Sequence, residues 1–429
     1  MTSNQEILFV WVYLPNQTAP ILCGRVSRSV LATGAPKGEF VYQRAYLHNP
    51  LALPLDPVLL PLKNITFDST LLNGHFSAFL NAGPDSWGRR EIDQSIGRQS
   101  DFGYLLHGAG DQVGAIAFSQ ANDLVPVNAG FNGLPSTTLL DLLNYAALLE
   151  DDLPVPEKYK HLLKFGTSAG GARPKATLLH ENRQWLAKFP STKDPNDLPS
   201  NPILEKSVLD LAEIAGLNVP ARKLIQIAGK DVLLVERFDR YCVGDTAVDW
   251  ARRRYVSART VFFSKPEVQR YAITGSYQRL SLELATWSHR TARDRLELFR
   301  RIVFNCLVNN LDDHDLNHGF IDGGNGFALS PLFDVVPQRP TGARSRLALN
   351  LGKFGGEATK ENLLSECDRF GLTISEADQI IENLWTVVKA RWESCLLANG
   401  VSKVHIERIA GAFCSDNFYK LNTHSTFPN

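Results

Sequence analysis

The chain has 429 residues, which is enough for two or three domains and for a large core that needs no disulfide bonds. Lysine plus arginine equals aspartate plus glutamate, at 45 each, which argues against binding nucleic acid through bulk positive charge. The six cysteines are scattered and form no CxxC pair, which indicates reduced thiols in a cytosolic protein.

The N-terminus carries no targeting signal that we recognise. The segment MTSNQEILFVWVYLP has no basic region and is interrupted by Pro15, so we do not expect a secretory signal. No uncharged apolar run reaches the roughly 18 residues of a membrane-spanning helix. We therefore predict a cytoplasmic protein that makes no contact with a membrane.

The first third of the chain is rich in β-strand signals. Residues 7–14 and 21–27 read as two strands around a turn at Pro15–Asn16, and residues 111–120 read as a further strand. A short helix is predicted to start near Asp85 or Ser86, which are good N-caps. The chain becomes rich in proline, glycine and asparagine near residue 125, so we predict a β-rich N-terminal module over residues 1–125.

The rest of the chain changes from mixed to helical character. Residues 172–180 and 184–190 read as two antiparallel strands, and residues 203–215 read as an amphipathic helix with Gly216 as its stop signal. Two more strands are predicted up to residue 240, and helical patterns dominate from residue 241. We therefore predict an α+β fold, with regions at 126–240 and 241–429 after the N-terminal module.

The segment FNCLVNNLDDHDLNHGFI carries the first chemical signal. An apolar helix ends near Asn309, and Asp312 and Asn317 follow it at a spacing of five residues. Phosphoryl transfer to a hydroxyl needs a carboxylate that accepts a proton and an oxygen ligand for magnesium, and protein kinases use this spacing. Loops and helix caps rich in Asp and Asn are also common, so this spacing alone leaves both interpretations open.

A second acid strengthens the phosphoryl-transfer interpretation. Asp334, in LSPLFDVVP, follows an apolar strand and comes 17 residues after Asn317. Two hard-oxygen ligands that flank a short hairpin are typical of a magnesium site.

Upstream segments supply the remaining parts of a nucleotide site in the order that kinases use. Small residues lie between Phe165 and Pro174, which allows backbone N–H groups to approach phosphate oxygens closely, although the segment is not a Walker loop. Lys188 ends the next predicted strand, and Glu205 on the following helix is its predicted ion-pair partner. Glu236 and Phe238 end the linking strand, where an adenine would meet backbone groups.

Taken together, SAGGARPKATL, WLAKFP, VERFDR, NNLDDHDLNHGFI and LSPLFDVVP resemble the HipA family of serine/threonine kinases, which are toxins of bacterial toxin–antitoxin pairs. DSWGRR and GAGDQVGAIAF resemble the N-terminal module of that family, so the resemblance covers nearly the whole chain. It implies a two-lobed protein-kinase-like fold with an extra N-terminal β-rich module, an N-lobe, an all-helical C-lobe, and ATP between the lobes.

The resemblance also implies roles for individual residues. Asp312 would be the catalytic base, and Asn317 and Asp334 would bind Mg²⁺. Lys188 would contact the phosphates of ATP. The other implied nucleotide-binding residues are Ser168, Ala169, Gly170, Gly171, Glu205, Glu236, Phe238 and His314.

Two positions within these motifs have special consequences. Ser168 matches the serine that such kinases autophosphorylate, and a phosphate there would add about two negative charges and displace the loop. Leu316 replaces the basic residue that family members usually carry before the motif asparagine. We expect His314 to orient the catalytic loop by hydrogen bonding.

The resemblance further implies a protein substrate, for which an aminoacyl-tRNA synthetase is the family's example, and growth arrest as the outcome. The implied partner is a helix-turn-helix antitoxin of the HipB type, through which the protein would meet DNA only indirectly. The alternatives are a lipid or sugar kinase and a catalytically silent relative that binds only an antitoxin or DNA.

Three further features have competing interpretations. A metal hydrolase would use Asp312, Asp313, His314 and His318 as ligands, but neighbouring residues on one loop point in different directions. The basic cluster in ARRRY, residues 251–255, is interpreted as solvated surface rather than as a contact for DNA phosphates. Trp87 is interpreted as a packing or interface residue.

Overall fold

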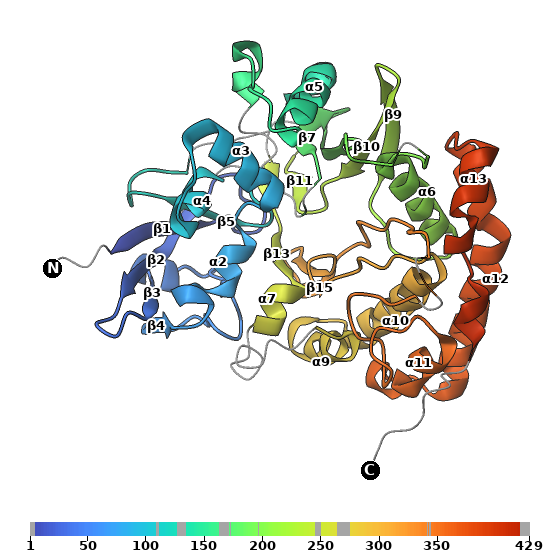
Figure 1. Ribbon diagram of the computed structural model, residues 1–429. Coiled ribbons are helices and arrows are strands. Elements are labelled where there is room, and N and C mark those ends of the chain that lie inside the picture. The colour runs from blue at the N-terminus through green and yellow to red at the C-terminus, as the bar shows by residue number, and fades with distance from the viewer. Residues whose placement is uncertain are drawn as a thin grey trace.

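The computed structural model describes residues 5–108, 111–126, 134–162, 171, 173–195, 197–244, 250–263, 275–340, 342 and 345–420. Ser168, Ala169 and Gly170 lie outside the described residues. Figure 1 shows the N-terminal elements on the left, a second group with β7 to β10 at the top, and a helical group at the lower right. The predicted division at residues 125 and 240 stays a prediction.

The N-terminal module is built on an antiparallel sheet with strand order β4-β3-β2-β1-β5. In β1, Val10, Trp11 and Val12 are all buried, so both faces of this central strand are covered. Trp11 also donates a 2.7 Å hydrogen bond to Ser119 on β5. The elements are β1 (Glu6–Val12), β2 (Ile21–Val30), β3 (Pro36–Tyr42), α1 (Arg44–Leu47), β4 (Thr66–Ser69), α2 (Ser77–Asn81), α3 (Ser86–Ile96), α4 (Asp101–His107) and β5 (Ile116–Ser119).

The upper lobe contains a sheet with strand order β6-β7-β8-β10-β9, in which only the β6–β7 pair is parallel among the described strands. Helix α6 packs against β10 and β9 and ends at Ile214, two residues before Gly216, whose φ of 76° suits the predicted stop. The elements are β6 (Leu134–Pro135), α5 (Leu139–Glu150), β7 (Lys175–His180), β8 (Arg183–Lys188), α6 (Asn201–Ile214), β9 (Arg222–Ile227) and β10 (Lys230–Glu236).

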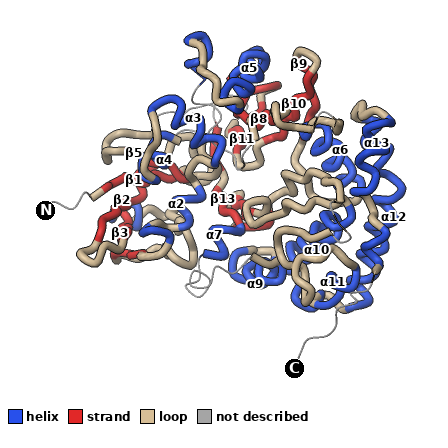
Figure 2. The backbone as a smooth tube through the Cα atoms, in the orientation of Figure 1, coloured by secondary structure: helices blue, strands red, loops and turns tan. Residues whose placement is uncertain are grey.

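The lower lobe is mainly helical, as Figure 2 shows, and its core joins α9, α10 and α12. The elements are β11 (Arg240–Cys242), β12 (Trp250–Arg252), β13 (Arg254–Ser257), α7 (Ala258–Phe263), α9 (Tyr277–Trp287), α10 (Thr291–Leu307), β14 (Gly319–Asp322), β15 (Phe327–Leu329), α11 (Lys360–Ser365), α12 (Ile374–Ala398) and α13 (Lys403–Ile409).

The predicted α+β class is confirmed, with one difference in the lower lobe. This lobe is not all-helical, because it also carries the β11–β12 pair and a sheet with order β13-β14-β15. Strands β14 and β15 form the hairpin between the two predicted magnesium ligands. In the part of the chain that the structure describes, no helix is both long and apolar enough to cross a bilayer.

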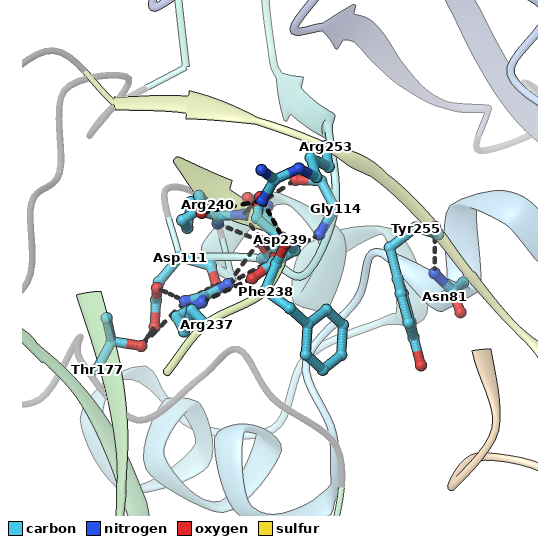
Figure 3. Close-up of polar contacts among 11 residues, drawn as sticks. Asn81, Asp111, Gly114, Thr177, Arg237, Phe238, Asp239, Arg240, Arg253 and Tyr255 are labelled. Carbon is cyan, nitrogen blue, oxygen red and sulfur yellow. Dashed lines mark hydrogen bonds and ion pairs between the residues drawn. The ribbon is translucent and has the colours of Figure 1, made fainter. Parts of the chain in front are cut away.

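A buried ionic network joins the N-terminal module to the segment after β10 (Figure 3). Arg237 pairs with Asp111 of the module and donates to both carboxylate oxygens of Asp239, at 3.0 and 2.9 Å. Arg240 donates to Asp239 at 2.6 Å, and the backbone N–H of Gly114 donates to the same carboxylate at 2.9 Å. Burial would raise the pKa of Asp239, but Arg237 and Arg240 outweigh burial and hold it below its ordinary value.

The basic cluster at residues 251–255 belongs to the same interface, so its interpretation as solvated surface is wrong. Arg252 is buried and stacks over Tyr13 of the N-terminal module at 4.2 Å. Arg253 donates to the carbonyl oxygen of Phe238 at 2.8 Å, and Arg254 forms an ion pair with Asp322. All three arginines bind partners within the chain. The charge pattern alone does not reveal these partners.

The network predicts a large penalty for Arg237→Leu, because the substitution leaves two buried carboxylates without their shared cation. We expect the free energy of unfolding in urea to fall by about 3–5 kcal/mol at pH 7. The penalty should shrink below about pH 4, where the unfolded Asp239 carboxyl protonates and the ion pair loses its contribution.

The matched control is Arg183→Leu, which removes an exposed ion pair with Glu236 on the neighbouring strand. This variant should unfold at nearly the wild-type urea concentration. Equal stabilities of the two variants would contradict a structural role for the buried network.

Candidate active site

Lys188 is the centre of the candidate site. It is the last residue of β8, and its ammonium group lies 2.7 and 2.8 Å from the two carboxylate oxygens of Glu205 on α6. The same group lies 2.8 Å from Oδ1 of Asp334, which comes shortly after β15. The backbone N–H of Asp334 donates to Glu205 at 3.0 Å. One cation therefore joins the upper sheet, its helix and the lower lobe.

The three charges shift one another's pKa values. Burial opposes the charged form of Lys188, but Asp334 and Glu205 outweigh it and raise the pKa of this lysine. Burial raises the pKa of Glu205 against the opposing effect of Lys188. Burial would also raise the pKa of Asp334, but Lys188, and then Lys175 and His314, lower it. Asp334 therefore stays ionised, as a metal-binding carboxylate must.

The loop after α10 presents the other predicted residues. Asp312 is exposed, whereas Asn317 is buried and donates from Nδ2 to the carbonyl oxygen of Asp312 at 3.1 Å. This bond turns the amide oxygen of Asn317 away from that carbonyl. The Nδ1 atom of His314 accepts from the backbone N–H of Leu316 at 3.3 Å. The backbone carbonyl oxygen of His314 accepts from the backbone N–H of Asn317 at 2.9 Å. These bonds agree with the expected loop-orienting role.

Asp313 anchors this loop inside the lower lobe. It is buried and accepts from Asn305 of α10 at 2.7 Å, from Tyr277 of α9 and from His318 at 2.9 Å. The metal-hydrolase alternative needs Asp313 and His318 as ligands. The structure instead pairs them with each other in the core, where they hold the loop in place.

The catalytic loop and the Asp334 segment are fastened to each other. The backbone N–H of Val336 donates to Asn310 at 3.4 Å, and Gln338 donates to the carbonyl of Asn309 at 3.1 Å. Asp334 itself has a φ of 60°, a left-handed conformation that is uncommon for a residue other than glycine. Such a conformation persists only where the surroundings hold it, and here Lys188 and Glu205 do so.

The predicted adenine-framing residues lie at the end of β10, where Glu236 is the last residue of the strand and Phe238 follows it. The Glu236 side chain pairs with Arg183 at 3.0 Å, and its backbone N–H donates to Ala221. The ring of Phe238 lies 5.7 Å from the ring of Phe333, the residue before Asp334. Figure 3 shows this ring projecting from the ionic network towards Tyr255, and the two ring centres are 6.0 Å apart.

Lys175 is a residue that our sequence interpretation missed. It is the first residue of β7 and lies directly opposite Lys188 in the β7–β8 ladder. Directly opposed residues of an antiparallel pair point to the same face of the sheet, so both lysines face the same side. The hairpin turn could have predicted that these lysines are paired. A two-residue turn at Glu181–Asn182 sets the register of β7 and β8, and both turn residues have positive φ.

The donor set fits a magnesium ion with a polyphosphate. Asn317 offers an amide oxygen and Asp334 offers a carboxylate, and both are hard-oxygen ligands of the kind that Mg²⁺ prefers. Lys188, in contact with Asp334, adds a positive charge that would meet phosphate oxygens. Gly171, the only predicted loop residue with a described position, has a φ of 123°, which glycine tolerates.

A strand lysine paired with a helix glutamate, facing an asparagine and an aspartate on two loops of a second lobe, is the site arrangement of a kinase. Comparison with known proteins agrees. The family model for the HipA-like C-terminal domain matches residues 167–392, which is more than half of the chain. The chain belongs to the HipA family of kinases.

Individual relatives support this assignment. The Sinorhizobium fredii protein Y4mE, whose name proposes a kinase, is 26% identical over 317 residues, covering 69% of this chain and 71% of that protein. The serine/threonine-protein kinase toxin HipA of Shewanella oneidensis is 26% identical over 306 residues, covering 66% of each chain. The structure of a Shewanella oneidensis HipA–HipB–operator DNA complex matches with a TM-score of 0.65 at 19% identity, covering 94% of both chains.

The anchoring role of Asp313 generates a prediction about stability. Asp313→Ala would leave the buried donors of Tyr277 and Asn305 without their acceptor. We expect the free energy of unfolding to fall by on the order of 3 kcal/mol in urea denaturation. Kinase activity should fall as well, because the loop that carries Asp312 loses its attachment to α9 and α10.

Asp315→Ala is the matched control in the same loop. Asp315 pairs with Arg259, whose side chain is 47% exposed, so its loss should change stability little. If Asp313→Ala were as stable and as active as Asp315→Ala, Asp313 would not be the anchor of this loop.

Proposed function

We propose that this kinase transfers the γ-phosphoryl group of Mg–ATP to a serine or threonine hydroxyl of a protein, as a toxin of the HipA type. The observation that carries the proposal is the contact of Lys188 with both Glu205 and Asp334. It supports the proposal because the lysine that would meet the phosphates lies against a carboxylate that would bind the metal, between the upper sheet and the lower lobe.

Each residue has a proposed role in the transfer. Lys188 binds the phosphates, and Glu205 keeps the lysine in position. Asn317 and Asp334 hold Mg²⁺, which neutralises charge on the phosphates when it is bound. Asp312 orients the acceptor hydroxyl and accepts its proton as the new oxygen–phosphorus bond forms and the bond to the leaving ADP breaks. The exposure of Asp312 allows an incoming protein segment to reach it.

Nucleotide binding would rearrange the charges around Lys188. Asp334 pairs with this lysine, and Mg–ATP would bring both a cation for Asp334 and anionic phosphates for Lys188. The Lys188–Glu205 bond would be retained in this exchange, because Glu205 is only 4% exposed and is fixed on α6.

The same proposal covers regulation and partners. Ser168, which lies outside the described residues, is the proposed autophosphorylation site, and phosphorylation there would add about two negative charges to its loop. A helix-turn-helix antitoxin of the HipB type is the proposed partner, because the matching solved structure contains HipA with HipB and operator DNA. An aminoacyl-tRNA synthetase is the proposed class of target, with growth arrest as the consequence.

Asp312→Ala tests the proposed base. Purified protein with Mg²⁺ and γ-labelled ATP should transfer label to protein, and Asp312→Ala should reduce the rate by about 10²-fold or more. The variant should still be stabilised thermally by Mg–AMP-PNP, because Asp312 touches the acceptor rather than the nucleotide. Asp315→Ala, in the same loop, serves as the control and should keep its activity.

Asp334→Ala separates metal binding from the proton transfer. This variant should lose both label transfer and the Mg²⁺-dependent part of nucleotide binding, because it lacks one of two protein ligands to the metal. Label that appears in a lipid or sugar fraction instead of protein would indicate a small-molecule kinase. Full activity or full toxicity of a well-folded Asp312→Ala protein would overturn the proposed mechanism.

A further inference from the structure

The start of helix α3 in the N-terminal module reaches into the upper lobe. Oδ2 of Asp85 lies 2.9 Å from the ammonium group of Lys175, and the two side chains are 10% and 3% exposed. The other carboxylate oxygen of Asp85 caps α3 by accepting from the backbone N–H of Gly88 at 2.7 Å. Asp85 therefore holds its own helix and a lysine of the kinase lobe with separate oxygen atoms.

The next two residues of α3 extend this contact. The carbonyl oxygen of Gly171 accepts from Ser86 Oγ at 3.2 Å and from the backbone N–H of Trp87 at 3.3 Å. The Trp87 side chain is buried within the core cluster of the upper lobe, together with residues of α5, β7 and β8. Packing and hydrogen bonds thus fix the start of α3 against the strand that carries Lys175.

The position of Lys175 connects this contact to the nucleotide site. Lys175 and Lys188 are directly opposite each other on β7 and β8, and like charges at such positions repel. Each lysine forms ion pairs with different carboxylates. Lys188 pairs with Glu205 and Asp334, and Lys175 pairs with Asp85. The charge of Lys175 also contributes to the low pKa of Asp334, which agrees with its place on the phosphate side.

We propose that Asp85 is a positioning residue of the kinase reaction, supplied by the N-terminal module. It holds the ammonium group of Lys175 beside Lys188, so that the two lysines form a fixed cationic pair for the phosphates of Mg–ATP. This inference rests on the proposed function. In it, the N-terminal module contributes a residue to the active site.

Two physical features favour positioning over simple helix capping. Asparagine and serine cap helices about as well as aspartate, so capping alone does not require a charge at residue 85. A buried ion pair is costly to desolvate and stabilises little compared with apolar packing, whereas it fixes geometry well. Displacement of a phosphate-binding group by about 1 Å is enough to slow phosphoryl transfer strongly.

The test is Asp85→Asn in the full chain, because this change keeps the cap and the shape and removes only the charge. Basal ATP hydrolysis at varied Mg–ATP should show kcat reduced by about tenfold or more, with KM for ATP changed by less than about threefold. Thermal unfolding checks that the variant is folded at the assay temperature. Its midpoint should fall below that of wild type, because the buried Lys175 loses a carboxylate partner. Asp85→Ser, which also caps well, provides a second variant if Asp85→Asn does not fold.

A double variant shows whether Asp85 acts through the lysine. In a Lys175→Met background, Asp85→Asn should lower kcat no further, because the group that it positions is absent. Asp101→Asn is the control, since Asp101 is an acid in the first turn of the next helix, α4, and pairs with Arg89 within the module. This control should leave kcat unchanged.

The outcomes separate this inference from the proposed function. A folded Asp85→Asn protein with kcat within twofold of wild type would overturn the positioning role and leave the kinase proposal standing. The positioning role would also be overturned if Asp85→Asn lowered kcat in the Lys175→Met background as much as in wild type. If wild type neither hydrolyses ATP nor is stabilised by Mg–AMP-PNP, the proposed function fails and this inference fails with it.

Discussion

The ammonium group of Lys188 links parts of the chain that fold as separate elements. It lies at the end of a strand, contacts Glu205 on the helix behind the sheet, and contacts Asp334 in the lower lobe. Because a buried cation needs a matching carboxylate, this contact holds the two lobes in a defined relation. The left-handed backbone of Asp334 is maintained by the same contact, so the strain at this residue and the position of its carboxylate have one cause.

Two of the contacts between the N-terminal module and the kinase lobes lie next to residues that are predicted to bind the nucleotide. At one point the buried Arg237–Asp239 network ties the segment before Phe238 to Asp111. At the other, Asp85 pairs with Lys175 beside the predicted phosphate position. A module that contacted the kinase only for stability could have used apolar surfaces at both places. Its use of buried charges beside Phe238 and beside Lys175 agrees with our proposal that the module sets the geometry of the site.

Sequence reasoning succeeded where a signal is local. Asp312 and Asn317 lie on one loop after α10, as predicted, and the amphipathic pattern places Glu205 on a helix. The roles of Asp312 and Asn317 in the reaction stay predictions. It failed where the signal is a contact between distant segments, as for Asp85 and Lys175, which are 90 residues apart. The arginines near residue 253 show the same limit, because a run of positive charge looks solvated until its buried partners are known. The resemblance to the HipA family was confirmed.

The most direct test of the central claim is a crystal structure with AMP-PNP and Mn²⁺, a magnesium substitute that anomalous scattering locates. The account predicts a manganese peak bound by the amide oxygen of Asn317 and the carboxylate of Asp334, with the nucleotide phosphates against Lys188. It also predicts that Lys188 keeps its contact with Glu205. A metal bound by Asp313 and His318, or a nucleotide bound away from Lys188, would contradict the account.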